Sequence, residues 1–82
     1  MAGSSEDVRG VKQVRSILSR RGIDVSRADV RVQNGVAYIR GFVAPMPSAN
    51  IPDIAIEMEH VAKIIRQKPE IRNVVLEITL PR

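Results

Sequence analysis

The fold is decided by residues 30–43, which read Val-Arg-Val-Gln-Asn-Gly-Val-Ala-Tyr-Ile-Arg-Gly-Phe-Val. Two runs rich in β-branched residues flank Asn34-Gly35, a dipeptide that supplies the positive φ angles of a two-residue type I′ turn. This pattern predicts a β-hairpin. The turn also sets the register, in which opposed residues share one face of the sheet. The expected pairs are Val32 with Ala37, Val30 with Ile39, Arg31 with Tyr38 and Gln33 with Val36.

The segment before the hairpin has the period of an amphipathic helix. Its apolar residues fall on one half of a helical wheel, which predicts a helix over residues 6–21. Ser4 or Ser5 is expected to cap the start of this helix, and Gly22 to end it. Residues 23–29 carry turn-forming polar side chains and are expected to form a connection to the hairpin.

The segment after the hairpin begins with a proline-rich stretch, residues 44–52, which predicts a loop. Asn50 is expected to cap a second amphipathic helix, which begins at about residue 51 and ends near Lys68, before Pro69. Residues 71–80 alternate in the manner of a strand whose more apolar face is buried.

These elements predict an α+β fold in the order α-β-β-α-β. Each helix and each strand has one strongly apolar face, so the economical arrangement packs both helices on one face of a three-stranded sheet. A right-handed crossover through the second helix would place the last strand parallel to a hairpin strand. Residues 6–82 are expected to form this single domain, after a flexible N-terminus at residues 1–5.

The composition of the 82-residue chain narrows the classes of function. It has no cysteine, which excludes disulfides, thiolate metal sites and cysteine nucleophiles. Its single histidine, His60, excludes a two-histidine metal site, and we interpret it as a solvated surface residue in preference to a pH sensor. Asp24, Asp29 and Asp53 are dispersed and are interpreted as turn and cap residues. We therefore expect no metal, no cofactor and no catalytic site.

The net charge of +4 lies entirely in the first half of the chain. Residues 1–42 carry eight basic and four acidic side chains, whereas residues 43–82 carry five of each. The largest basic cluster lies on the first predicted helix, opposite its apolar stripe. Such a cluster is either a solvated face or a surface for anionic lipid headgroups. The candidate lipid- or anion-binding residues are Arg9, Lys12, Arg15 and Arg20.

A second candidate surface is the face of the sheet that the helices leave uncovered. It is either the ordinary mixed surface of a one-sided sheet or a small apolar patch, rimmed by charge, for protein docking or self-association. In the loop, Met46 is a further apolar candidate, whereas Ile51 is expected to start the buried stripe of the second helix. The candidate protein-contact residues are Arg31, Val36, Tyr38, Arg40 and Val75.

Two spaced motifs carry a family resemblance. The hairpin has the pattern Val30-x-Val32-x-Asn34-Gly35-Val36-x-x-Ile39-x-Gly41-x-Val43, and the last strand has the pattern Ile71-x-x-Val74-Val75-x-x-Ile78-x-Leu80. In this element order, the motifs resemble those of the BON domain, a bacterial module named for osmotic-shock and nodulation proteins. The chain departs from that family at Glu70, where glycine is usual, at Leu76, where asparagine is frequent, and in a longer segment between the hairpin and the last strand.

The resemblance implies a divergent, non-enzymatic binding module of the bacterial cell envelope, with no catalytic residue and no cofactor. Its implied partners are anionic phospholipid or another envelope protein, and its implied compartment is the periplasm or cell envelope. These residues contain no recognisable signal peptide or transmembrane segment, so a complete chain would instead indicate the cytoplasm.

Two alternatives remain from the residues themselves. The first is a protein-docking or oligomerisation module that uses the open sheet face and binds no lipid; a homo-oligomer is one form of it. The second, weaker alternative is nucleic-acid binding. The basic charge permits it, but the chain offers no aromatic pair expected to stack bases and no G-x-x-G clamp.

Overall fold

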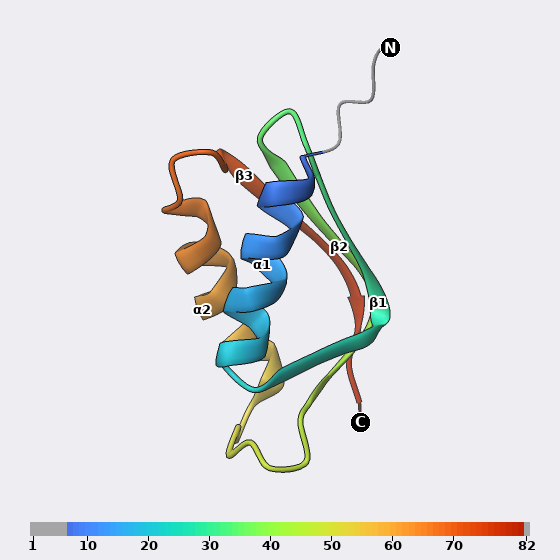
Figure 1. The fold of residues 1–82 in the computed structure, drawn as a ribbon. Helices are drawn as coiled ribbons and strands as arrows, with labels where there is room; N and C mark the ends of the chain where they lie inside the picture. The colour runs from blue at the N-terminus through green and yellow to red at the C-terminus, as the bar shows by residue number, and fades with distance from the viewer. Residues whose placement is uncertain (1–6, 82) are drawn as a thin grey trace.

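The computed structural model describes residues 7–81, whose arrangement is shown in Figure 1. Both helices cover the same face of a three-stranded sheet. The sheet order is β1-β2-β3, with β1 antiparallel and β3 parallel to the central strand β2. The predicted α+β fold in the order α-β-β-α-β is therefore confirmed. The elements are α1 (Val8–Arg20), β1 (Ile23–Gln33), β2 (Val36–Pro45), α2 (Ile54–Arg66) and β3 (Asn73–Thr79).

The hairpin between β1 and β2 has the predicted turn and register. Asn34 and Gly35 have φ angles of 53° and 79°, as a type I′ turn requires. All four predicted pairs are present, from Gln33 opposite Val36 at the turn to Val30 opposite Ile39. The register sends one face of the hairpin to the helices and leaves the other open.

Strand β1 begins at Ile23, so the prediction of a connection over residues 23–29 is wrong. The pairing register shifts between Asp24 and Arg27. The Asp24 carboxylate accepts a hydrogen bond from the Ser26 N–H at 2.8 Å. The polar turn-formers therefore make an irregularity inside a strand, where an extra residue bends the chain without ending the pairing.

Helix α1 begins at Val8 with Asp7 as its N-cap, two residues after the predicted start. The Asp7 carboxylate accepts a hydrogen bond from the Gly10 N–H at 2.9 Å. The predicted caps, Ser4 and Ser5, and the predicted flexible terminus at residues 1–5 lie outside the described residues. The last residue of the helix is Arg20. Arg21 is its C-cap, and Gly22, the predicted stop, comes next.

Helix α2 is capped by Asp53, so the prediction of Asn50 as its cap is wrong. The Asp53 carboxylate accepts hydrogen bonds from the N–H groups of Ala55 and Ile56 at 3.0 and 3.2 Å. The cap therefore lies after Pro52 rather than before it, and the helix is shorter at both ends than predicted.

The core lies between the two helices and the sheet face they cover. None of the buried side chains among residues 7–81 is polar or charged. Strand β3 contributes only partly buried side chains to this core, on the face predicted for it. The buried cluster consists of Val14, Leu18, Ile23, Val30, Val32, Ala37, Ile39, Val43, Met58, Val61, Ile65 and Ile71.

Candidate functional site

Helix α1 directs its basic side chains away from the sheet because its other side is packed against the core. Val14 and Leu18 on that side are fully buried. The start of the helix is tied to β1, since the Asp7 N–H donates a hydrogen bond to the Val32 carbonyl at 2.7 Å. The basic side of α1 is therefore held in a fixed position on the helical layer.

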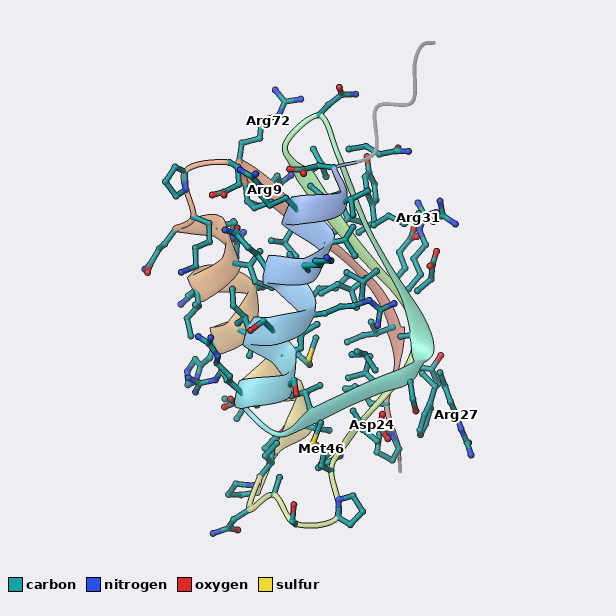
Figure 2. The ribbon with its side chains drawn as sticks, viewed as in Figure 1. Arg9, Asp24, Arg27, Arg31, Met46 and Arg72 are labelled. Carbon is teal, nitrogen blue, oxygen red and sulfur yellow. The ribbon has the colours of Figure 1, made fainter. Side chains whose placement is uncertain are left out.

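Three of the four predicted anion-binding residues line one groove on this layer. Arg9, Lys12 and Arg20 share it with Lys68, which follows α2, and the groove has a volume of about 370 Å³. Figure 2 shows Arg9 at the first turn of α1, on the helical side of the molecule. The fourth predicted residue, Arg15, is exposed on α1 but does not line the groove. Arg9, Lys12, Arg20 and Lys68 are called the basic groove below.

The cations of the basic groove form no ion pair with any acidic side chain of residues 7–81. Three other arginines form ion pairs within residues 7–81, whereas Arg15, Arg27, Arg66 and Arg72 form none there. The three Arg–carboxylate pairs are Arg21 with Glu57 at 2.5 Å, Arg31 with Asp29 at 2.8 Å and Arg40 with Glu77 at 2.5 Å. The groove is therefore distinguished by four such cations lining one surface, and a cluster of one sign attracts anions.

Neutral polar groups lie beside these cations. Gln13 and Ser16 also line the groove. The Gln13 Oε1 atom is buried and has no hydrogen-bond partner among residues 7–81. That oxygen is an acceptor and cannot bond a phosphate oxygen. The Gln13 NH2 group and the Ser16 hydroxyl can donate, so together with the cations they suit phosphate oxygens, which accept both charge-assisted and neutral hydrogen bonds.

Sequence reasoning missed Lys68 as a member of this site. Lys68 belongs to the end of the second helical segment, and only the packing of both helices on one sheet face brings it to α1. A signal was present in the sequence, because Lys63, Arg66 and Lys68 concentrate positive charge near the C-terminal end of α2. The fold, rather than the local pattern, joins the two clusters.

The predicted protein-contact residues lie on the open face, the face of the sheet turned away from the helices. The register places Arg31, Tyr38 and Val75 in one row across the three strands. Arg40 follows along β2 with its guanidinium 5.1 Å from the centroid of the Tyr38 ring. It also pairs with Glu77 on the neighbouring strand. Arg31 and Arg40 are therefore held on the open face by interactions with other side chains of that face.

On the open face, the pairing with β3 gives the predicted apolar patch a polar neighbour at one end and an aromatic neighbour at the other. Val36 lies at the start of β2 opposite the polar Asn73. Phe42, which sequence reasoning did not place on this face, lies between Arg27 and Thr79 in the register. Figure 2 shows Arg27 projecting away from the helices. Both aromatic residues of the chain thus follow the open side of the central strand.

A larger hollow of about 780 Å³ lies between the end of α1, the start of α2 and the loop after β2. Met46, labelled in Figure 2, and Ile51 line it, and both are half-buried. Arg21 pairs with Glu57 across this hollow, and the hydrogen bond to that carboxylate raises the pKa of Arg21. The exposed His60 imidazole lies 4.0 Å from the same carboxylate. The central charges of this hollow therefore balance each other.

The three aspartates interpreted as turn and cap residues do not gather in space. Asp53 caps α2, Asp29 pairs with Arg31, and Asp24 closes the irregularity in β1. The hydrogen bond from the Ser26 N–H lowers the pKa of Asp24. Within residues 7–81, no group of three or more His, Cys, Asp or Glu side chains could hold a metal ion.

No protein-family model, curated protein or solved structure matches this chain. The resemblance of the hairpin and the last strand to the BON domain therefore stays a prediction. No helix among the described residues is long and apolar enough to cross a membrane. Function must be inferred from the surfaces themselves, of which the basic groove has the most distinct chemistry.

Proposed function

We propose that this chain is a non-enzymatic binding module that docks on anionic phospholipid surfaces through the basic groove. One observation carries the proposal: four cations from α1 and the end of α2 line one groove and have no ion pair within residues 7–81. Unpaired charges of one sign on one face focus the electrostatic potential there. The groove is open, which suits a surface of headgroups better than an enclosed small anion.

The expected strength of attachment follows from the number of cations. A basic side chain near an anionic membrane contributes about 1 kcal/mol. Four such residues give about 4 kcal/mol, which corresponds to a dissociation constant of about 1 mM. Binding of this strength is reversible, weakens as salt screens the charges, and becomes firm only when several copies or linked modules act together.

Helix α1 binds the surface without inserting into it. Its apolar side chains Val14 and Leu18 are buried in the core and are not available to the acyl layer. An interfacial helix of the inserting kind buries a free apolar face below the headgroups. The proposed contact is therefore electrostatic, between the groove and the headgroup phosphates. The BON resemblance adds support, since it implies attachment to lipid of the bacterial cell envelope.

Co-sedimentation with phospholipid vesicles tests the proposal. We expect the chain to pellet with vesicles rich in phosphatidylglycerol at low salt and to remain in solution with pure phosphatidylcholine. The double variant Arg9→Glu/Lys12→Glu should lose most of this binding. Failure of the wild-type chain to pellet with either vesicle at low salt would contradict the proposal.

A matched control separates the groove from net charge. Arg27 and Arg72 are exposed and do not line the groove. Arg27→Glu/Arg72→Glu lowers the net charge of +4 by the same amount as the groove variant, because each substitution replaces one positive with one negative charge. The control should keep clearly more vesicle binding than the groove variant. Equal losses would show that overall charge, not the groove, drives attachment.

A second candidate function is protein docking through the open face, with no lipid binding. Both aromatic side chains and Val75 on that face support it. The pairing of Arg31 and Arg40 with carboxylates of the same face leaves little charge for an anionic partner there. Under this candidate, Tyr38→Glu would abolish partner binding, whereas the groove variant would leave it intact.

A further inference from the structure

The two edges of the sheet differ in how they are protected from pairing with another strand. Strand β1 has an irregularity at Asp24 and Arg27, and near its other end the Val32 carbonyl accepts a hydrogen bond from the start of α1. It also carries alternating charges. Strand β3 has a continuous register from Asn73 to Thr79, with no irregularity and a single charged residue. Bulges and charges are the usual defences of an edge, and β3 has almost none.

The backbone of β3 presents a regular set of hydrogen-bonding groups to its outer edge. In a two-residue hairpin, Gln33 and Val36 exchange hydrogen bonds, so residues 37, 39 and 41 of β2 bond on its other side. The parallel register then directs residues 73, 75 and 77 of β3 toward β2. The N–H and C=O groups of residues 74, 76 and 78 face outward. The Val74 N–H donates a hydrogen bond to Asn73 Oδ1 at 2.9 Å rather than to β2, which agrees with an outward direction.

The side chains of β3 are more apolar than its burial explains. Five of the eight residues from 73 to 80 are aliphatic, yet none of these residues is fully buried. Val74, Leu76 and Ile78 pack against the core but stay partly exposed, whereas β1 buries three aliphatic side chains completely or nearly so. Among the described residues, the sheet order β1-β2-β3 gives β3 no strand neighbour on this side.

We propose that β3 pairs with β3 of a second copy of this chain, antiparallel and about a two-fold axis at Leu76. In this register, similar residues of the two copies lie opposite each other. The apolar Val74 faces Ile78, and the polar Asn73 faces Thr79. The two Glu77 carboxylates do not face each other, because each lies opposite Val75. Each Glu77 is paired with Arg40 of its own chain. The β3 strand of the second copy therefore does not have to supply a cation opposite it.

The pairing joins two three-stranded sheets into one continuous sheet. The three outward residues of each strand, Val74, Leu76 and Ile78, would exchange hydrogen bonds in opposed pairs. The Val74 N–H would leave the Asn73 side chain for a carbonyl of the other copy. Because the two-fold pairing uses the β3 edge of each copy, no unpaired β3 edge remains in the dimer, and this limits growth into longer assemblies.

Amide hydrogen exchange by NMR, measured together with sedimentation equilibrium from micromolar to millimolar chain concentration, tests the pairing. We expect a monomer–dimer equilibrium in which protection of the Leu76 and Ile78 amides rises with the dimer fraction. The Val75 and Glu77 amides, which face β2, serve as internal controls and should be protected at every concentration. A monomer throughout would overturn the proposal, and so would a dimer in which Leu76 and Ile78 stay unprotected.

Two substitutions at Val75, each introducing a long side chain but of opposite charge, test the register. Val75 lies on the open face opposite Glu77 of the second copy, so Val75→Glu creates two like-charge pairs and Val75→Lys two opposite-charge pairs. We expect the dissociation constant of the dimer to be about tenfold higher for the glutamate variant than for the lysine variant. Equal constants in two folded variants would contradict this register. Tyr38→Glu, which would disrupt stacking of two open faces, should leave the edge pairing unchanged.

Discussion

Replacing Gly41 with alanine tests the place where β2 passes closest to the bent strand β1. Gly41 has a φ of +115°. A Cβ added there would lie 2.8 Å from the Arg27 carbonyl oxygen and 3.0 Å from the Ala28 Cα. The backbone conformation alone costs a non-glycine residue about 1–3 kcal/mol, and overpacking against a backbone adds about 1–3 kcal/mol. With partial relaxation, we expect Gly41→Ala to lower the free energy of unfolding by about 2–4 kcal/mol.

Urea denaturation followed by far-UV circular dichroism measures this loss, with the m-value as a check that the unfolding transition stays the same. For a domain of this size, the loss corresponds to a fall in Tm of roughly 10–25 °C. Gly35→Ala is the matched control. Gly35 has a φ of +79°, but the nearest atom to an added Cβ is 3.3 Å away in the flexible Arg72 side chain.

The control separates the two sources of the cost. Gly35→Ala should lose only about 1–2 kcal/mol, because it meets the conformational penalty without a collision with backbone. A Gly41→Ala variant as stable as Gly35→Ala would show that the close approach of Gly41 to β1 adds nothing to the cost, contrary to this prediction. A wild-type-like Gly41→Ala variant would also refute the positive φ at this position.

Three further predictions concern the helices and the irregularity in β1. Asp53→Ala should lower the free energy of unfolding by about 1 kcal/mol in urea titrations, because it removes the N-cap of α2; no loss would argue against this cap. Met58→Ala should lower it by about 2–5 kcal/mol, whereas Ile56→Ala, at a side chain 52% exposed, should change it by no more than about 0.5 kcal/mol. The Asp24 carboxyl should titrate by NMR below its usual range, because the Ser26 N–H stabilises the carboxylate. Its stabilising effect is therefore complete above the ordinary pKa and is lost as pH falls through the lowered one, so an Asp24 pKa at or above the ordinary value would contradict the assignment.

The hairpin could be predicted from the sequence because its information is local. Asn34 and Gly35 favour one turn, and a two-residue turn leaves one register for the flanking strands. Val30 and Val32 then share the buried face with their partners, as predicted. The two helices could also be predicted, because each segment has one apolar stripe with a helical period. One such stripe can be buried against one face of the sheet. Their ends were less predictable, because Asp53 and Asn50 are both competent caps and tertiary packing decides between them.

The errors and omissions come from contacts between segments distant in the chain. Residues 23–29 have the polar side chains of a turn, but pairing with the end of β2 holds them in a strand. Arg15 fits the basic stripe of α1, yet the groove forms on the side where α1 approaches the end of α2. Lys68 belongs to the site for the same reason. The pattern of one helix does not specify which part of its polar side a second helix borders.

The most direct test of the central claim is to locate the membrane on the folded chain. Paramagnetic relaxation enhancement by NMR, with spin-labelled headgroups in phosphatidylglycerol-rich bicelles at low salt, reports which amides lie near the lipid. We expect the strongest broadening at Arg9, Lys12 and Lys68, and its loss at high salt. Broadening centred on Tyr38 and Val75, or none above that seen with neutral bicelles, would contradict it.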